Sequence, residues 1–354
     1  MRTRGYRLHA WGGPLSWEEW ETPQPGAGDA LIQVEACGIG LTVLNCIRGD
    51  LSNTAPLPRV PGHELVGRVV AVGEGVSPDL VGQRVIGYFY LTCGVCGPCR
   101  AGRDSRCANM AGWLGVHRDG GYADFAVIPA ANALPISESI DPTLATAIPD
   151  AIATSLHVCK TRLRVTPLDR VVVIGAGGGV GIHMTQMVHL FGATVCGLEI
   201  DEGKFSAIRE AGGEPALSRV WDDVRLPETW HGEAPTAIVD LIGTLESLGW
   251  SVGALDMGGS LAVLTTFRDR SFPLTPREMV FRELRIVGSR YTNKSEVIEA
   301  AQLVADGRIK PVVSMIVAPE DIEQAHGALR HNTLLGRGAV RWPMEEQTGA
   351  LTHL

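Results

Sequence analysis

The stretch that decides the fold is Val171-Val-Val-Ile-Gly-Ala-Gly-Gly-Gly-Val-Gly181, in which four β-branched residues run into a glycine-rich turn. The apolar run predicts a buried strand, and the pattern from about Ile182 predicts a helix directly after the turn. A G-x-G-x-x-G reading fits only from Ala176, with Gly178 and Gly181 at the second and third glycine positions. Such a unit binds the pyrophosphate of a dinucleotide at the helix N-terminus, although a plain tight turn also explains a glycine run.

An acidic residue supports the dinucleotide interpretation. A second predicted strand begins at Thr194 and ends at Glu199, which lies 21 residues beyond Gly178. A carboxylate at that place accepts hydrogen bonds from the ribose hydroxyls of NAD and repels the 2′-phosphate of NADP, although an acid at a strand end is often only a solvated terminus. The residues expected to bind NAD here are Gly178, Gly179, Val180, Gly181 and Glu199.

Strands and helices alternate after about residue 150. The predicted elements are Arg170–Ile174, Gly181–Phe191, Thr194–Leu198, Glu202–Ala211, Ala237–Ile242, Leu245–Leu255 and Ser260–Leu264. Strands that alternate with helices predict βαβ units and a doubly wound parallel sheet. The sequence therefore indicates the α/β class.

The first 150 residues and the C-terminal part show a different pattern of predicted elements. Short runs separated by proline and glycine predict strands at Ala30–Ala36, Leu65–Val72, Gln83–Val85 and Ala123–Ile128. After about Tyr291 the pattern predicts helix, strand, helix and strand at Ser295–Asp306, Ile309–Val313, Pro319–Leu329 and Gly338–Trp342. The closing residues, Glu345–Leu354, look like a frayed tail.

Four of the eight cysteines cluster as Cys93-x2-Cys96-x2-Cys99-x7-Cys107. Four thiolates suit tetrahedral zinc, and a site made of four cysteines is closed and therefore structural. An iron–sulfur cluster and four unrelated thiols are the alternatives, and both rank below zinc. We expect a structural zinc lobe at about residues 90–110.

Composition and charge narrow the class of protein further. The chain has 354 residues, of which 45% are apolar and 20% charged, and this excludes wholesale disorder. The formal net charge of −8 argues against a nucleic-acid partner. The first residues lack the apolar core of a signal peptide, and the apolar runs are far shorter than the ~20 residues that span a bilayer. We expect a cytoplasmic protein with a small-molecule substrate and no membrane partner.

Over nearly its full length the chain resembles the zinc-containing medium-chain dehydrogenase/reductase family, which includes the alcohol dehydrogenases. The resemblance is carried by Pro61-Gly62-His63-Glu64, the four-cysteine lobe, Asp119-Gly-Gly121, the glycine turn with Glu199 and Lys204, and Gly336-Arg337. It implies a GroES-like β-barrel catalytic domain at 1–151 and 291–354, interrupted by a Rossmann coenzyme domain at 152–290. It also implies an active site in the cleft between the domains and a homodimer or homotetramer.

The resemblance assigns roles to individual residues. Lys204 would bond the adenosine ribose, Arg337 the pyrophosphate and Thr154 the nicotinamide side. Phe89 stands at the family's pocket-lining position, and the nearby Trp113 is a second candidate for the wall of an apolar substrate pocket. Each of these two aromatic residues is equally interpretable as part of the core.

The family's catalytic zinc normally takes a cysteine, the histidine of a G-H-E motif, and a further cysteine or carboxylate. Here the resemblance places His63 and Asp150 in two of these positions, with Glu64 as a neighbouring or exchanging ligand. Two positions depart from the family pattern, because Gly40 replaces the ligand cysteine and Val43 replaces the aspartate that braces the histidine. Loss of such a bracing bond typically costs ~10–100-fold in metal affinity, so a catalytic site with zinc and one without zinc are both alternatives.

Three further residues bear on this site. Thr42 keeps the hydroxyl that relays the substrate proton in the family, and Asn45 stands where many relatives carry a histidine that passes the proton to solvent. Cys37 is a conceivable substitute ligand. Strand alternation, however, points it away from the side of residue 40, and a buried core thiol is the preferred interpretation.

Three functions remain open from the sequence. The leading hypothesis is NAD(H)-dependent interconversion of an alcohol and an aldehyde or ketone, with a zinc on His63, Asp150 and Glu64 as Lewis acid. The second keeps the fold but has no catalytic zinc, and reduces an activated double bond of the enone type with His63 and Asp150 as an acid–base pair. The third is a coenzyme-binding redox sensor without catalysis.

Overall fold

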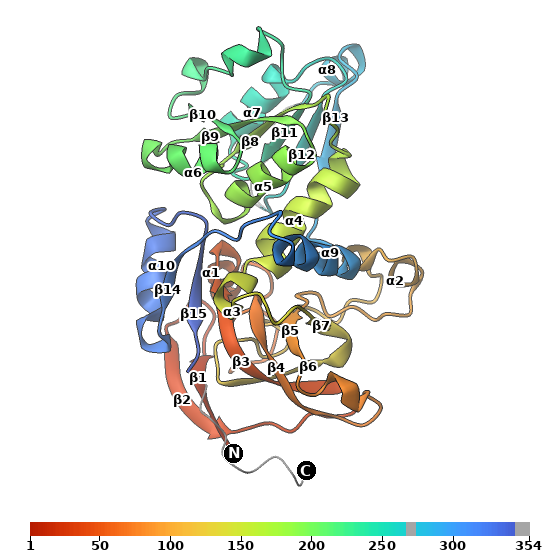
Figure 1. Cartoon of the computed structure of the whole chain (residues 1–354), viewed down its shortest axis with the longest axis vertical. Coiled ribbons are helices and arrows are strands. Elements are labelled where there is room, and N and C mark those ends of the chain that lie inside the picture. Colours follow the sequence, from red (N-terminus) through yellow and green to blue (C-terminus); the bar gives the residue numbers. More distant parts are fainter. Residues whose placement is uncertain (267–273, 344–354) are drawn as a thin grey trace.

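The protein is described by a computed structural model that covers residues 1–266 and 274–343. Two domains are stacked along the long axis of the molecule, a β-rich domain at one end and an α/β domain at the other (Figure 1). The tail predicted at residues 345–354 lies outside the described residues. The α/β class predicted from the sequence is confirmed.

The α/β domain is built on six parallel strands in the order β10-β9-β8-β11-β12-β13. The strands are β8 (Arg170–Ile174), β9 (Thr194–Glu199), β10 (Glu214–Leu217), β11 (Ala237–Asp240), β12 (Ser260–Val263) and β13 (Arg285–Gly288). The helices are α5 (Gly179–Leu190), α6 (Phe205–Glu210), α7 (Leu245–Ala254) and α8 (Pro276–Phe281). Val171 and Val172 of β8 enter two different apolar clusters, because successive side chains point to opposite faces of the sheet. Both faces are therefore buried, as in the doubly wound sheet that was predicted.

The β-rich domain contains a two-stranded hairpin and a seven-stranded sheet. Its strands are β1 (Arg2–Leu8), β2 (Leu15–Glu21), β3 (Asp29–Ile39), β4 (Leu65–Val72), β5 (Arg84–Gly87), β6 (Phe125–Pro129), β7 (Ala133–Pro135), β14 (Val313–Val317) and β15 (Arg337–Arg341). The sheet runs β14-β15-β3-β4-β5-β7, and β6 pairs with β3. Because β15 pairs antiparallel with β3, the end of the chain returns to the domain in which it began.

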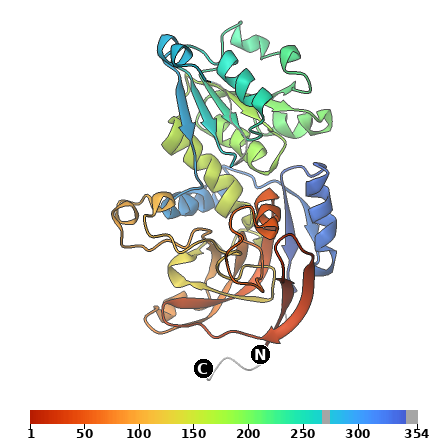
Figure 2. The same cartoon turned by 180° about the vertical axis from the view of Figure 1, so that it is seen from behind.

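The remaining helices lie in the β-rich domain or between the two domains (Figure 1). They are α1 (Leu41–Arg48), α2 (Gly97–Arg100), α3 (Pro142–Ala145), α4 (Ala153–Leu156), α9 (Lys294–Ala305) and α10 (Ile322–Arg330), with π-helical turns at Ile148–Ile152 and His157–Leu163. Short 3₁₀ turns lie at Pro78–Leu80, Asp104–Arg106, Ala130–Asn132, Glu202–Lys204, Trp221–Asp223, Glu228–Trp230 and Pro319–Asp321. Figures 1 and 2 show the loop around α2 beside α9. No helix in the two described ranges has the length and apolar character needed to cross a membrane.

The structure contains five strands that were not predicted, β1, β2, β7, β10 and β13, and it also differs from the predicted elements at the C-terminal side. The strand predicted at Ile309–Val313 is wrong, since β14 begins only at Val313. Gly307 adopts a left-handed conformation after α9, Ile309 packs into the core, and Pro311 has no N–H for a strand ladder. The helix predicted from residue 181 begins earlier, at Gly179.

Candidate active site

His63 and Glu64 lie where the chain enters β4. The preceding Gly62 has φ +95°, and a Cβ there would lie only 2.6 Å from a ring carbon of Tyr122, so this turn requires glycine. His63 is 2% exposed and Glu64 fully buried. Asp150 comes from a different element, the π-helical turn Ile148–Ile152. The structure brings the three predicted residues together, since His63 Nε2 lies 3.6 Å from Oε1 of Glu64 and 3.7 Å from Oδ2 of Asp150.

Arg337, at the start of β15, enters the same site. Its Nη2 atom lies 2.5 Å from Oδ2 of Asp150 and 2.8 Å from Oε1 of Glu64, the same oxygens that face His63. The side chain is 4% exposed. A Cβ at residue 40 would overlap the Nη1 atom of Arg337, so the guanidinium fills the space beside Gly40. Arg337, which was predicted to bind the pyrophosphate, therefore also contacts the two carboxylates predicted for the catalytic site.

The pKa values of the two carboxyl groups shift in opposite directions. Burial raises the pKa of Glu64 well above its usual range, and the nearby Arg337 only partly offsets this effect. Burial also raises the pKa of Asp150, but the charge of Arg337 and the contact with His63 outweigh it, and the pKa of Asp150 lies far below its usual range. The guanidinium thus holds Asp150 ionised.

Several buried polar atoms of the site make no hydrogen bond within the described part of the chain. They are Nδ1 and Nε2 of His63, Oε2 of Glu64 and Nε of Arg337. Oε1 of Glu64 instead forms an ion pair with Arg337. Val43 offers no acceptor to His63, which agrees with the departure from the family pattern noted in the sequence. Because unpaired buried polar groups are costly, these atoms are candidates for contact with a ligand.

The donor types alone suit a catalytic zinc, because one imidazole and two carboxylates come within 4.8 Å of one another. Arg337 argues against this fit. Its single positive charge already compensates part of the charge on the two oxygens that would bind the ion, and two cations would have to share these oxygens in a buried setting. We therefore conclude that these residues, in this arrangement, do not fit a catalytic zinc.

The other residues predicted around the catalytic site are placed as follows. Thr154 donates a hydrogen bond from Oγ1 to Oδ1 of Asp150 at 3.3 Å. Thr42 is the second residue of α1 and half-buried, and the Asn45 side chain accepts a hydrogen bond from Arg48. Cys37 lies in the core, where Cβ atoms on Gly62 and Gly121 would approach its sulfur, and it is not among the donors brought together with His63.

Aromatic side chains form one wall beside the imidazole. The ring of Phe89 lies 4.6 Å from that of His63, and Trp113 contacts Tyr90 edge-on at 6.5 Å. Tyr291 was missed by sequence reasoning: its hydroxyl accepts a hydrogen bond from the backbone N–H of Phe89 at 3.2 Å, and its φ is +49°. A positive φ in a tyrosine is rare and often marks a functional site, but no sequence motif signals it.

The glycine-rich turn joins β8 to α5 and has the close packing that was predicted. A Cβ on Gly181 would overlap the carbonyl oxygen of Gly175, whereas a Cβ on Gly178 would meet only that same oxygen, at 3.3 Å. Because α5 begins at Gly179, the N–H groups of Gly179, Val180 and Gly181 belong to its first turn and have no partner within the helix. These donors suit a pyrophosphate.

Glu199 and Lys204 meet at the same turn. Oε2 of Glu199 accepts a hydrogen bond from the backbone N–H of Gly177 at 2.9 Å, and Oε1 accepts one from Ile200 at 2.8 Å. Nζ of the buried Lys204 donates to the carbonyl of Asn332 at 3.2 Å. The carboxylate and the ammonium group therefore flank the turn on the side where the sequence places the adenosine ribose.

The four cysteines come together around α2. One ligand atom from each lies within 4.8 Å of the others, and the sulfur of Cys107 is 3.5 Å from that of Cys93 and 4.0 Å from that of Cys96. Zinc–sulfur bonds of about 2.3 Å in a tetrahedron place sulfurs about 3.8 Å apart, so the spacing fits the ion. Backbone N–H groups of Cys99 and Ala108 lower the pKa of Cys96 to about 6, which favours the thiolate.

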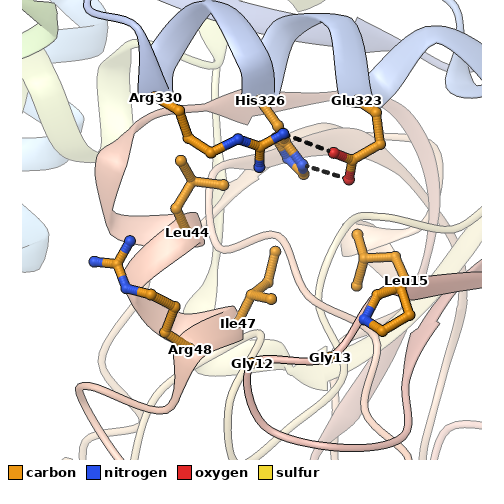
Figure 3. A pocket seen from close by; sticks show the side chains of 10 residues that line it. Gly12, Gly13, Leu15, Leu44, Ile47, Arg48, Glu323, His326 and Arg330 are labelled. Carbon is orange, nitrogen blue, oxygen red and sulfur yellow. Dashed lines mark hydrogen bonds and ion pairs between the residues drawn. The ribbon is translucent and has the colours of Figure 1, made fainter.

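A separate cavity of about 330 Å³ lies between α1 and α10 (Figure 3). Leu44 and Ile47 line one side, and Glu323, His326 and Arg330 line the other. Oε1 of Glu323 is 3.1 Å from Nδ1 of His326, and its Oε2 is 3.0 Å from Nη2 of Arg330. These groups satisfy one another, and none of the predicted site residues lines the cavity.

Two parts of the chain match known families. Residues 26–138 match the family described as alcohol dehydrogenase GroES-like domain, and residues 179–306 match that described as zinc-binding dehydrogenase. The L-threonine 3-dehydrogenase of Saccharopolyspora erythraea is 32% identical over 279 residues, which are 77% of this chain and 80% of that protein. The chain belongs to the zinc-containing medium-chain dehydrogenase/reductase family.

Other members of this family resemble the chain along most of its length. The NAD-dependent alcohol dehydrogenase of Sulfolobus acidocaldarius is 26% identical over 355 residues, which cover 94% of this chain and 98% of that enzyme. The crystal structure of AibC superimposes with a TM-score of 0.88 at 28% identity, and the match covers 97% of this chain and 96% of that one. The predicted family, its GroES-like and Rossmann folds, and the oxidoreductase class are confirmed.

Proposed function

We propose that the protein is an NAD(H)-dependent oxidoreductase that interconverts an alcohol and an aldehyde or ketone. One observation carries the proposal: a single side chain, Arg337, spans the distance from the glycine-rich turn to the catalytic carboxylates. Its Cδ and Nε lie 2.8 and 3.0 Å from the position of a Cβ on Gly179, while Nη2 contacts Glu64 and Asp150. A coenzyme on the turn therefore adjoins the residues expected to handle the substrate.

The residues around the turn fit NAD. The first N–H groups of α5 and the unpaired Nε of Arg337 are donors for a pyrophosphate, and Glu199 suits a ribose with free hydroxyls. Bound there, NAD⁺ would supply the acceptor for a hydride from the carbinol carbon, so that overall alcohol and NAD⁺ would give a carbonyl compound, NADH and one proton. The buried carboxylate of Glu199 disfavours the 2′-phosphate of NADP.

The chain's own side chains would prepare the substrate. Thr42 would accept the hydroxyl proton and pass it toward solvent, as the family resemblance implies. Thr154 would lie at the nicotinamide side, where its bond to Asp150 fixes the orientation of that carboxylate. Phe89 and Trp113 would exclude water from an apolar substrate pocket, together with the newly recognised Tyr291.

Zinc enters the proposal at one place only. The sulfurs of Cys93, Cys96, Cys99 and Cys107 would hold a structural ion that rigidifies the loop around α2. No step is assigned to a catalytic ion, because Arg337 occupies the carboxylates that would bind it.

The contact of Arg337 with these carboxylates favours the second function, reduction of an enone-type double bond, since substrates with delocalised charge depend less on a Lewis acid. Nε2 of His63 is 3.7 Å from Asp150, so the direct acid–base pair of that hypothesis is not hydrogen-bonded here.

Steady-state kinetics test the proposal. NADH oxidation should be followed with matched panels of aldehydes, ketones and enones, and NAD⁺ reduction with the corresponding alcohols. Turnover of carbonyl compounds and alcohols supports the proposal, whereas turnover confined to enones supports the second function. Flat traces with every compound, together with tight NADH binding, would instead support the redox sensor. A cytoplasmic location and assembly into a homodimer or homotetramer stay predictions from the sequence.

A further inference from the structure

We infer that Arg337 supplies the fixed positive charge of the catalytic cleft in place of a second zinc ion, and that Gly40 is the residue that makes this possible. The inference rests on the proposed function in that it treats the cleft as the substrate site. It goes further, because it names the group that takes over the position and charge of the metal.

The first step concerns the space beside Gly40. This residue has φ −136° and ψ 172°, an extended conformation that any residue adopts, so its backbone does not require glycine. What glycine provides is room, because a Cβ at this position would overlap Nη1 of Arg337. The position that carries the ligand cysteine in the family pattern is thus filled by a guanidinium.

The second step concerns how firmly Arg337 is held. The backbone N–H of Gly336 donates to the carbonyl of Gly177 at 3.1 Å, and that of Arg337 donates to Val312 at 2.9 Å. Strand β15 then pairs with β3 from Gly338 onward. Backbone bonds fix one end of the side chain and two carboxylates fix the other, so the guanidinium is not a loose surface group.

The third step is charge. Nη2 of Arg337 contacts Oδ2 of Asp150 and Oε1 of Glu64, and these are the oxygens nearest to Nε2 of His63. A zinc ion on the same oxygens would place a divalent cation beside a buried monovalent one. The like charges repel most strongly where water cannot screen them, and the guanidinium already compensates part of the carboxylate charge without the ion.

The fourth step is the loss of zinc donors. Glycine at residue 40 removes a thiolate, and Val43 cannot accept a hydrogen bond from Nδ1 of His63, which is unpaired in the described part of the chain. Cys37 does not compensate, because its sulfur packs against the positions of Gly62 and Gly121 in the core. Each loss weakens a metal site, and both occur next to the residue that opposes the ion.

The decisive experiment counts zinc. Metal-replete, unchelated protein should be analysed by mass spectrometry for zinc per subunit, with NADH affinity measured on the same samples. Wild type should hold one zinc, and Cys96→Ser should hold none. Gly40→Cys adds a thiolate and displaces the guanidinium, so it should raise zinc from one to two. Gly40→Ala is the matched control, since it displaces the guanidinium without adding a ligand and should stay at one.

Two results would overturn the inference. One is two zinc ions in wild type, with one lost in Asp150→Ala and the other in Cys96→Ser. The other is a zinc ion that Cys96→Ser still holds, since this variant has lost the site in the cysteine lobe. Circular dichroism shows which variants fold, and the wild-type and Cys96→Ser counts decide the matter even if both residue 40 variants unfold. Zinc content and turnover are separate readouts, so one zinc with no turnover of any carbonyl or enone contradicts the proposed function but leaves the zinc inference standing.

Discussion

Nε2 of His183 accepts a hydrogen bond from the backbone N–H of Val312 at 2.9 Å, while its Nδ1 donates to the carbonyl of Gly179 at 2.7 Å. One buried imidazole thus joins the glycine-rich turn to the segment that leads into β15. Both bonds exist together only in the neutral ring with its proton on Nδ1, because a protonated ring has no acceptor. The carbonyl of Val312 in turn accepts from the N–H of Arg337, so the imidazole is also linked to the proposed active site.

The first prediction is a loss of stability at mildly acidic pH. Burial lowers the pKa of His183 to about 4, although its bond to Gly179 acts in the opposite direction. In the unfolded chain this histidine takes up its proton near pH 6.5, so the unfolded state gains protons first as the pH falls. The free energy of unfolding should fall by about 3 kcal/mol from this residue alone between pH 6.5 and pH 4. Urea denaturation at a series of pH values measures it.

His183→Gln is the control for that titration. Its amide has both a donor and an acceptor for the partners of His183 but no titrating group. The pH dependence of stability between 6.5 and 4 should therefore become shallower in this variant than in wild type. If the two curves stay parallel, His183 is not the group responsible.

The second prediction separates two glycines of the turn. Gly181→Ala should lower the free energy of unfolding of the coenzyme-free protein by about 2 kcal/mol, because the new Cβ would overlap the carbonyl oxygen of Gly175. Gly178→Ala should leave that stability nearly unchanged, because its Cβ would meet the same oxygen at 3.3 Å. Thermal unfolding without coenzyme tests the difference, and NADH fluorescence titration then measures binding.

For NADH binding, Gly178→Ala should be the variant with the informative effect. Gly178→Ala should weaken NADH binding severalfold although it folds normally, because the added methyl group stands where the pyrophosphate approaches the backbone. Normal NADH affinity in Gly178→Ala would contradict the placement of the coenzyme on this turn. Equal destabilisation by both alanines would contradict the packing argument.

The third prediction concerns the coenzyme preference. Glu199→Gln keeps an acceptor for the N–H of Gly177 but removes the negative charge at the ribose. NADH should bind about tenfold more weakly, since hydrogen bonds to charged groups contribute about 1.5–3 kcal/mol. The affinity for NADPH should fall less or rise, because the repulsion of its 2′-phosphate is removed. Dissociation constants for both coenzymes, measured side by side, give the ratio.

Asp201→Asn is the matched control for Glu199→Gln. It removes an acidic group two residues away, whose side chain accepts from the N–H of Gly203 at the start of a 3₁₀ turn. The ratio of NADH to NADPH affinity should change much less than in Glu199→Gln. A clear NADPH preference of the wild type would refute the role given to Glu199.

Local sequence patterns were enough for the parts of the fold that depend on local physics. The strands Leu65–Val72 and Arg170–Ile174 have the bounds predicted, because β-branched runs bounded by turn residues leave few alternatives. The four cysteines also meet as predicted, because they are close in the chain. The short strands β10 and β13 were missed, since four residues containing proline or charge carry almost no periodic signal.

The residues of the proposed active site were predictable from the sequence, but their arrangement was not. Family resemblance nominated His63, Asp150 and Arg337, yet 187 residues separate the last two, and only the fold shows that they touch. The sequence alone shows that Gly40 replaces the ligand cysteine of the family pattern. That a guanidinium fills the space beside Gly40 depends on how β15 enters the cleft, which no pattern of residues near Gly40 encodes. The place of Tyr291 in the site was not predicted either, because it also depends on how distant parts of the chain come together.

The fourth prediction concerns the cysteine lobe and its contact with α9. The lobe docks through two bonds to the start of that helix: the N–H of Ser105 donates to the Asn293 side chain at 3.2 Å, and Asp104 accepts from the N–H of Lys294 at 3.2 Å. Cys96→Ser should lose the structural zinc and loosen these bonds. The expected result is a Tm lower by several degrees and faster proteolytic cleavage near residues 95–105, because the ion contributes directly to the folding of its loop.

Val95→Ser is the control within the same loop. Its side chain is 70% exposed and binds no ion, so zinc content, Tm and protease sensitivity should match the wild type. NADH affinity should be nearly unchanged in both variants, since the lobe packs against α9 and not against the glycine-rich turn. If Cys96→Ser loses its zinc but unfolds at the wild-type temperature, the lobe is held by Asp104 and Ser105 alone, and the ion has no structural role.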